Sequence, residues 1–111
     1  MTFNQWDILV VPFPFVDSPQ HKPRPVLVIS NDKFNSANSH CIAAMITTAS
    51  NTSWHGDTEV TDLKVSGLKI KSYIRMKLFT LDSKIEPRSI GKLSKEDIAN
   101  FKKNFSQATF I

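Results

Sequence analysis

The stretch Pro23-Arg24-Pro25-Val26-Leu27-Val28-Ile29-Ser30 places a conformationally restricted arginine directly before an apolar run. Both prolines fix φ, and Pro25 also disfavours the helical region for Arg24, so the backbone that carries this guanidinium is extended and has little freedom. The apolar residues that follow are mostly β-branched and do not alternate with polar ones, which is typical of a strand buried on both faces. We therefore expect a permanently charged side chain at the start of a core strand. This arginine either belongs to a functional site or only donates hydrogen bonds to nearby carbonyl groups.

A second apolar run, from Cys41 to Thr47, is predicted to pair with the first as an antiparallel hairpin. The connection between them, residues 31–40, is polar and rich in Asn and Ser. Symmetric pairing about its middle places Ser30 opposite Cys41 and Arg24 opposite Thr47. Arg24 and Thr47 should therefore emerge together at one end of the sheet, where functional sites are commonly built.

The stretch from Leu68 to Leu78 has period two, with even positions that are apolar except for Ser72, which predicts a strand with two different faces. No acidic residue occurs between Lys64 and Lys77. A face of cations interleaved with an aromatic ring is expected to follow phosphates and stack a base. The alternative is a lysine-rich strand that prevents edge-to-edge aggregation. The residues of this face are Lys69, Lys71, Tyr73, Arg75 and Lys77.

The remaining pattern predicts further strands and one clear helix. Strands are expected from Asp7 to Phe15 and, more exposed, from Thr58 to Leu63. Ser94 is a natural N-cap, and Asp97 is placed to return the capping-box hydrogen bond. The helical stripe expected to pack on the sheet is Ile98, Phe101, Phe105 and Ala108. The predicted fold is mainly β with a C-terminal helix, in one domain over residues 1–111.

Composition fits an ordinary globular protein with a basic balance. The 111 residues carry a net charge of +4, with a sequence pI near 9.4 and 11 lysines to 3 arginines. No apolar run approaches the roughly 20 residues that span a bilayer. The N-terminus has neither the basic nor the apolar region of a signal peptide, and the lone Cys41 reads as a small core residue in a reducing compartment. We therefore expect a cytoplasmic protein without a membrane partner.

Several kinds of catalytic site are excluded by the sequence. The three glycines are far apart and form no phosphate loop, no Cys/His cluster has zinc spacing, and no carboxylate cluster suggests a two-metal nuclease. The groups that remain are Arg24, Thr47, Thr48, Arg75 and His21. They suit RNA cleavage by the substrate's own 2′-hydroxyl, which needs phosphate orientation, proton transfer and charge stabilisation but no protein nucleophile and no metal or other cofactor.

The single-stranded RNA is expected to lie along the basic face and the loops near Arg24. Trp54 has two interpretations, since it either caps the core from its loop or stacks on a base. The residues predicted to bind RNA are Lys22, Thr48, Trp54, Lys69, Lys71, Tyr73 and Lys77.

Five segments in a fixed order resemble the MazF/PemK toxin family. The resemblance covers about residues 6 to 105, and its most specific part is the Arg-Pro strand followed by an alanine-rich strand that ends in threonine. The segments are Trp6-Asp7-Ile8-Leu9-Val10, Arg24-Pro25-Val26-Leu27-Val28-Ile29-Ser30, Ala43-Ala44-Met45-Ile46-Thr47-Thr48, Ser72-Tyr73-Ile74-Arg75 and Ile90-Gly91-Lys92-Leu93.

This resemblance implies an SH3-like small barrel of the MazF/CcdB toxin fold that acts as a homodimer. It also implies a sequence-specific, metal-independent endoribonuclease that arrests growth and is neutralised by a cognate antitoxin protein. Residue by residue, Arg24 matches the catalytic arginine of the family and Thr47 its catalytic threonine, or Thr48 if the register slips. Arg75 matches an arginine that serves catalysis in some members.

The sequence departs from the family pattern at three places. Trp6 stands where a glycine usually precedes the aspartate, and the loop of residues 16–22 lacks the usual glycines and glutamate. Lys77 replaces an aspartate found in some members two residues after the arginine. The general acid and base are therefore open, with His21 as a candidate.

Two alternatives remain beside a toxin-type endoribonuclease. One is a CcdB-like poison of gyrase, and the other is a non-catalytic nucleic-acid-binding barrel; the fold alone permits both. The ribonuclease is favoured because a protein poison has no evident need for Arg24 and Thr47 at one strand end.

Overall fold

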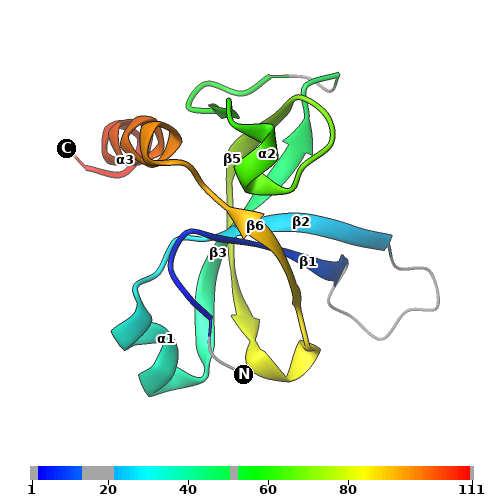
Figure 1. Ribbon diagram of the computed structural model, residues 1–111. Coiled ribbons are helices and arrows are strands. Elements are labelled where there is room, and N and C mark those ends of the chain that lie inside the picture. The colour runs from blue at the N-terminus through cyan, green and yellow to red at the C-terminus, as the bar shows by residue number, and fades with distance from the viewer. Residues whose placement is uncertain (1–2, 14–21, 51–52, 111) are drawn as a thin grey trace.

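The apolar run after Arg24 lies in the middle of a six-stranded sheet in the computed structural model, which describes residues 3–13, 22–50 and 53–110. Neighbouring strands in the sheet follow the order β4-β5-β3-β2-β1-β6, and every pair is antiparallel. The sheet curls into a half-barrel (Figure 1). The predicted mainly β fold with a C-terminal helix is confirmed.

The bounds of the elements are as follows. The strands are β1 (Asp7–Phe13), β2 (Lys22–Val28), β3 (His40–Thr48), β4 (Thr58–Val60), β5 (Ser72–Asp82) and β6 (Arg88–Lys92). The helices are α1 (Asp32–Asn38), α2 (Leu63–Ser66), the 3-10 turn η1 (Ser83–Ile85) and α3 (Lys95–Thr109).

The register of β2 on β3 is the one that the symmetric hairpin predicts. Val26 lies opposite Met45 and Val28 opposite Ala43. Continued two residues toward the start of β2, this register places Arg24 opposite Thr47. The polar connection contains α1, which begins at the N-cap Asn31 and ends in a left-handed residue at Ser39. Counting from the middle of the connection thus gives the observed pairs.

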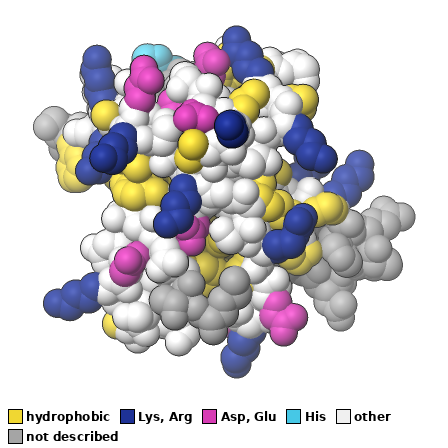
Figure 2. Space-filling model, in the orientation of Figure 1, with side chains coloured by type: hydrophobic (Ala, Val, Ile, Leu, Met, Phe, Trp, Pro, Cys, Tyr) yellow, Lys and Arg dark blue, Asp and Glu magenta, His cyan; other side chains and the backbone are white. Residues whose placement is uncertain are grey.

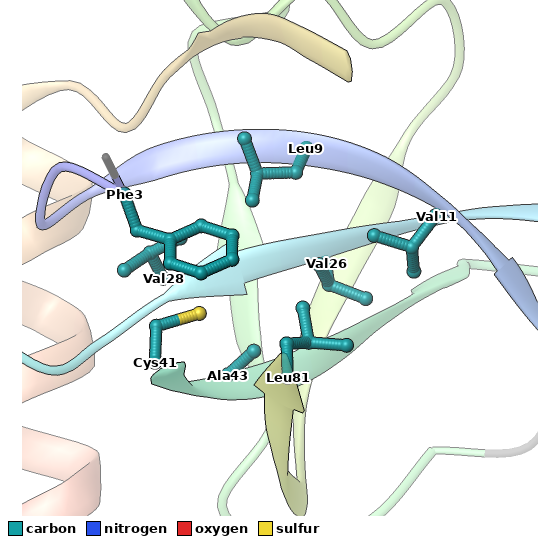
Figure 3. Close-up of a cluster of buried hydrophobic side chains, with 8 residues drawn as sticks. All are labelled: Phe3, Leu9, Val11, Val26, Val28, Cys41, Ala43 and Leu81. Atoms are coloured by element: carbon teal, nitrogen blue, oxygen red, sulfur yellow. The ribbon is translucent and has the colours of Figure 1, made fainter. Parts of the chain in front are cut away.

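Apolar side chains pack on both faces of the sheet, as the unalternating runs of β2 and β3 predict. One cluster brings together side chains from the N-terminal segment, β1, β2, β3 and the end of β5 (Figure 3); its members are Phe3, Leu9, Val11, Val26, Val28, Cys41, Ala43 and Leu81. The other lies on the opposite face; its members are Ile8, Leu27, Ala44, Ile46, Val60, Ile74, Leu93 and Phe101. Burial raises the pKa of the Cys41 thiol to about 12, so this cysteine is an inert core residue.

The helices lie at two ends of the sheet. In Figure 1, α1 lies at one end, whereas α2 and α3 lie toward the other. From the predicted stripe of α3, Phe101 is buried, and Ile98 and Phe105 pack against the second cluster, but Ala108 is exposed. No helix in the described part of the chain is both long and apolar enough to cross a membrane.

Trp6 occupies a backbone conformation that favours glycine. Its φ is 73°, in the left-handed region that costs a non-glycine residue about 1 kcal/mol. The conformation is held on both sides, because the Trp6 N–H donates to the Val28 carbonyl at 2.8 Å and the Trp6 carbonyl accepts from Leu93 at 2.9 Å. The indole packs edge-on against Phe101, with ring centroids 6.0 Å apart. This contact with α3 offsets the strain where the family pattern has glycine.

The predicted strand from Leu68 to Leu78 begins later than expected. Residues 63–66 form α2, Gly67 ends it with a φ of 78°, and β5 begins only at Ser72. Lys69 and Lys71 therefore lie before the strand and not on its face. At the start of β5 the predicted faces are confirmed, since Ile74 is buried in the second cluster while Tyr73 and Arg75 face the other side. Further along, the register of β5 on β3 shifts between Ala44 and Met45, and Leu78, predicted on the buried face, is 42% exposed.

The capping box predicted at α3 is only half formed. Ser94 caps the helix by accepting from the Asp97 N–H at 3.2 Å, as expected. The fully buried Asp97 carboxylate, however, reaches away from Ser94 to another segment. It accepts hydrogen bonds from the Thr61 N–H at 2.8 Å, the Thr61 hydroxyl at 2.6 Å and the Asp62 N–H at 3.3 Å. Asp97 therefore ties α3 to the chain between β4 and α2.

Asp97→Ala is expected to lower the free energy of unfolding by about 3 kcal/mol, because three donors lose their acceptor inside the protein. Ser94→Ala, which removes only the cap, should lower it by about 1 kcal/mol. Urea denaturation followed by circular dichroism measures both values. An Asp97→Ala protein as stable as Ser94→Ala would contradict the anchoring role.

Candidate active site

A hollow of about 440 Å³ opens on the sheet beside Met45, which also packs against the first hydrophobic cluster. Strands β1, β2, β3 and β5 all contribute to it. Its lining residues are Phe13, Arg24, Met45, Ile46, Thr47, Arg75 and Lys77. Three cations and a hydroxyl among three apolar side chains form a site suited to an anion such as a phosphodiester.

Arg24 supplies an accessible cation to this hollow. It is exposed on β2, where its neighbour on β1 is Val11. Among the ion pairs of the described residues, none involves Arg24. Thr47, half-buried on β3, lines the same hollow. The two residues that the sequence places opposite each other thus meet at one site.

Arg75 differs from Arg24 because it is buried and paired. Its side chain is only 8% exposed, and Asp57 holds it by two hydrogen bonds. Nε donates to Oδ1 at 3.1 Å, and Nη2 donates to Oδ2 at 2.8 Å. This side-on fork fixes the plane of the guanidinium as well as its position.

The pair shifts the pKa values of both partners toward the charged forms. Burial alone would raise the pKa of Asp57, but hydrogen bonds from Arg75 and the Trp54 N–H, with the Arg75 charge, lower it below its usual range. The Asp57 hydrogen bond raises the pKa of Arg75. Because the carboxyl pKa is lower in the folded protein, the pair stabilises the fold above about pH 4, and that stability is lost as the pH falls through the folded pKa.

Trp54 lies against the cations of the site. The Arg75 guanidinium carbon is 5.0 Å and the Lys77 Nζ 5.2 Å from the ring centroid, within the range of cation–π interactions. The side chain is 43% exposed and belongs to neither hydrophobic cluster. The interpretation of Trp54 as a cap on the core is therefore wrong.

Comparisons with known proteins agree with this architecture. A family model described as PemK-like, MazF-like toxin of type II toxin-antitoxin system matches residues 4–108. The chain belongs to this family. No curated protein sequence matches it.

Solved structures share the fold of the toxin at low sequence identity. MazF from Deinococcus radiodurans is 14% identical, with a TM-score of 0.75 over 100% of this chain and 99% of that one. Mycobacterium tuberculosis toxin MazF-mt6 is 21% identical, with a TM-score of 0.72 over 92% and 94%. A mycobacterial endoribonuclease, solved in complex with its cognate antitoxin, is 11% identical, with a TM-score of 0.73 over 96% and 92%. The predicted MazF-like fold is confirmed.

The toxin gathers some of the residues predicted to bind RNA and leaves others apart. Lys77 lines the hollow, and the ring of Trp54 lies against two residues that line it, Arg75 and Lys77. Tyr73 lies opposite Thr47 in the sheet. Lys22 is exposed two residues before Arg24 on β2.

Three other predictions fit the structure less directly. Thr48 follows Thr47 on β3, and its hydroxyl lies 3.0 Å from that of Ser50 rather than in the lining of the hollow. Lys69 and Lys71 lie outside the hollow as well. The candidate acid or base His21 lies outside the described residues.

The acid-free stretch of sequence does not produce an acid-free surface. Asp57 pairs with Arg75, and Glu59 on β4 lies 4.0 Å from Lys71. On the face seen in Figure 2, Lys and Arg side chains are spread out with acidic side chains between them. The prediction of one unbroken basic face is therefore wrong, and the useful cations are those in the hollow.

Asp57 is the residue of the site that sequence reasoning missed. Thr58 pairs with Ile74, and continuing this register by one residue places Asp57 opposite Arg75. Antiparallel pairing centred on Ser66 would have predicted this partner from the sequence. The centre is not evident from the sequence pattern, because β4 ends at Val60 and a helix follows it instead of a longer strand.

Proposed function

We propose that the toxin is an endoribonuclease that cleaves single-stranded RNA with the substrate's own 2′-hydroxyl as nucleophile. The observation that carries the proposal is the meeting of Arg24 and Thr47, from adjacent strands, at one hollow that Arg75 also lines. Membership of the toxin family and the likeness to a solved endoribonuclease support it.

In the proposed reaction, the 2′-oxygen attacks the neighbouring phosphorus and the bond from phosphorus to the 5′-oxygen breaks. The products are a 2′,3′-cyclic phosphate and a 5′-hydroxyl, after one proton leaves the 2′-hydroxyl and another reaches the 5′-oxygen. Arg24 stabilises the charge that develops on the non-bridging oxygens, because its planar fork matches them. The Thr47 hydroxyl donates to one of the same oxygens, and His21 stays a prediction for one proton transfer.

The chemistry is assigned to the protein's own cations. Among the described residues, no three His, Cys, Asp or Glu side chains gather where they could hold a metal ion. Arg24, Arg75 and Lys77 supply positive charge in the hollow instead. Because cations at the hollow can stabilise the developing charge themselves, we propose a metal-independent reaction that needs no cofactor.

The RNA is proposed to run over the hollow and the residues around it. Lys22 and Lys77 would contact phosphates, while Tyr73 and Trp54 offer rings for a base. Lys69, Lys71 and Thr48 would contact the RNA farther from the hollow.

The biological partners are proposed from the relatives. The mycobacterial endoribonuclease and the Deinococcus radiodurans MazF have structures with their antitoxins, which supports a cognate antitoxin for this toxin. A homodimer in the cytoplasm is the state we propose for it.

The test is incubation of a long single-stranded transcript with the purified toxin in excess EDTA. We expect cleavage that leaves 2′,3′-cyclic phosphate ends, and no cleavage at a site whose 2′-hydroxyl is replaced by hydrogen. A gyrase supercoiling assay runs in parallel. Intact RNA in EDTA would overturn the proposal, and inhibition of supercoiling with intact RNA would establish the gyrase alternative.

A further inference from the structure

We propose that Asp57 is a positioning residue that fixes the Arg75 guanidinium for the reaction, a role that rests on the proposed ribonuclease function. Asp57 lies immediately before β4, and the register of β4 on β5, continued by one residue, places Arg75 opposite it. The side chain of Asp57 is 7% exposed and that of Arg75 8%. A buried ion pair next to an exposed cation at the same hollow calls for a functional explanation, because such pairs add little net stability.

The geometry makes Asp57 an orienting group rather than a base. Both of its oxygens accept from Arg75, and Oδ2 also accepts from the Trp54 N–H at 2.8 Å. These donors hold the carboxylate in its ionised form. A base must have a lone pair directed at the substrate proton, whereas the oxygens of Asp57 are directed at Arg75 and at the Trp54 backbone.

The backbone of Asp57 is held by its own turn and by α3. The Asp57 N–H donates to the Trp54 carbonyl at 3.1 Å, closing the turn before β4. Asn104 of α3 donates from Nδ2 to the Thr58 hydroxyl at 2.7 Å and to the Asp57 carbonyl at 3.4 Å. The C-terminal helix thus holds the backbone of Asp57, whose carboxylate holds the guanidinium at the hollow.

The pairing divides the work between the two arginines. Arg75 and Asp57 together carry no net charge, so Arg75 attracts a distant phosphate only weakly and acts through directed donors. Arg24 and Lys77, which have no ion pair among the described residues, supply the net charge of the hollow. Charge for binding and direction for the transition state therefore come from different residues.

Asp57→Asn is expected to separate the two effects. The amide sets an N–H against one of the two Arg75 donors, so the guanidinium loses its orientation and kcat falls about 10- to 100-fold. The charge of Arg75 is no longer neutralised by its partner, so KM for the RNA stays the same or falls. Binding of a 2′-deoxy oligonucleotide becomes more sensitive to salt for the same reason. A purely structural defect would not tighten binding while slowing the reaction.

Two further variants isolate the cause. Asp57→Glu keeps the charge but moves the carboxylate, so kcat should fall while the salt dependence of binding stays that of the wild type. Glu59→Gln is the control for a lost negative charge: it leaves the partner of Arg75 in place, so kcat should stay that of the wild type, while any change in binding reports its own partner Lys71.

A double-mutant cycle with Arg75→Ala completes the test, with thermal unfolding measured for every variant. If Asp57 acts through Arg75, adding Asp57→Asn to Arg75→Ala causes no further loss of kcat. Wild-type cleavage with an unchanged kcat in Asp57→Asn, or an equal loss in the Arg75→Ala background, overturns this role alone. No cleavage by the wild type overturns the proposed function and this role together. If Asp57→Asn does not fold, kcat and the salt dependence of binding in Asp57→Glu decide whether Asp57 positions Arg75.

Discussion

Arg24→Ala should lower kcat for RNA cleavage about 10³-fold, and Arg24→Lys should restore only part of the loss. Removing a group that stabilises developing charge typically costs this much, and an arginine at a phosphoryl group can contribute more. Lysine returns a point charge but not the two parallel donors that match phosphate oxygens. A series with Arg above Lys above Ala would therefore separate geometry from charge.

The backbone around Arg24 explains why a nearby cation cannot replace it. Pro23 and Pro25 limit the conformations on both sides, and pairing with Val11 on β1 sets the position of the strand. Lys77 lines the same hollow but on a flexible, exposed side chain. The backbone of Arg24 is already fixed, so directing its guanidinium at the transition state costs only side-chain entropy.

Initial rates with a fluorogenic oligonucleotide, made around a cleavage site mapped with the wild type, measure the series. Arg88→Ala is the control, because Arg88 is the remaining arginine of the chain and is exposed on β6 away from the hollow. Equal rates for Arg24→Ala and Arg88→Ala would remove Arg24 from the proposed site.

The part of the site that the sequence predicts depends on short-range pairing. Arg24 and Thr47 belong to two strands whose connection is symmetric, so counting residues was enough to place them together. The apolar runs of β2 and β3 also predict that both faces of the sheet are covered, because a strand with one face in solvent would alternate apolar and polar residues.

The part that the sequence does not predict depends on partners that no local pattern identifies. Period-two alternation tells which side chains share a face, but it does not tell where a strand begins; α2 and Gly67 replace the first residues of the expected strand. The partner of Arg75 comes from another strand, and the partners of Asp97 come from the segment after β4. A buried carboxylate accepts hydrogen bonds from whichever donors lie nearest in space, and the tertiary structure determines which donors those are.

Gly91→Ala should lower the free energy of unfolding by about 4 kcal/mol or prevent folding, since its Cβ has no space. A Cβ built on Gly91 falls well inside 3.0 Å of the Ser66 and Val65 backbone, a separation that Cβ atoms essentially never show. The contact is reciprocal, because a Cβ on Gly67 would overlap the Ile90 backbone. No rotamer change relieves a clash with backbone, so α2 would have to move away from β6.

Gly56→Ala is the control that separates this clash from the ordinary cost of replacing glycine. Gly56 has a φ of 97°, but the nearest atom to its Cβ is Met76 Cγ at 3.9 Å, so only backbone strain of about 1 kcal/mol is expected. Urea denaturation of both variants gives the comparison, and a Gly91→Ala protein within 1 kcal/mol of Gly56→Ala would show that α2 can shift at little cost. Because α2 is joined to β5 by only five residues, the same shift would move the start of the strand that carries Arg75. The close contact of α2 with β6 would then support the site as well as the fold, and the folded fraction of Gly91→Ala should cleave RNA more slowly than Gly56→Ala.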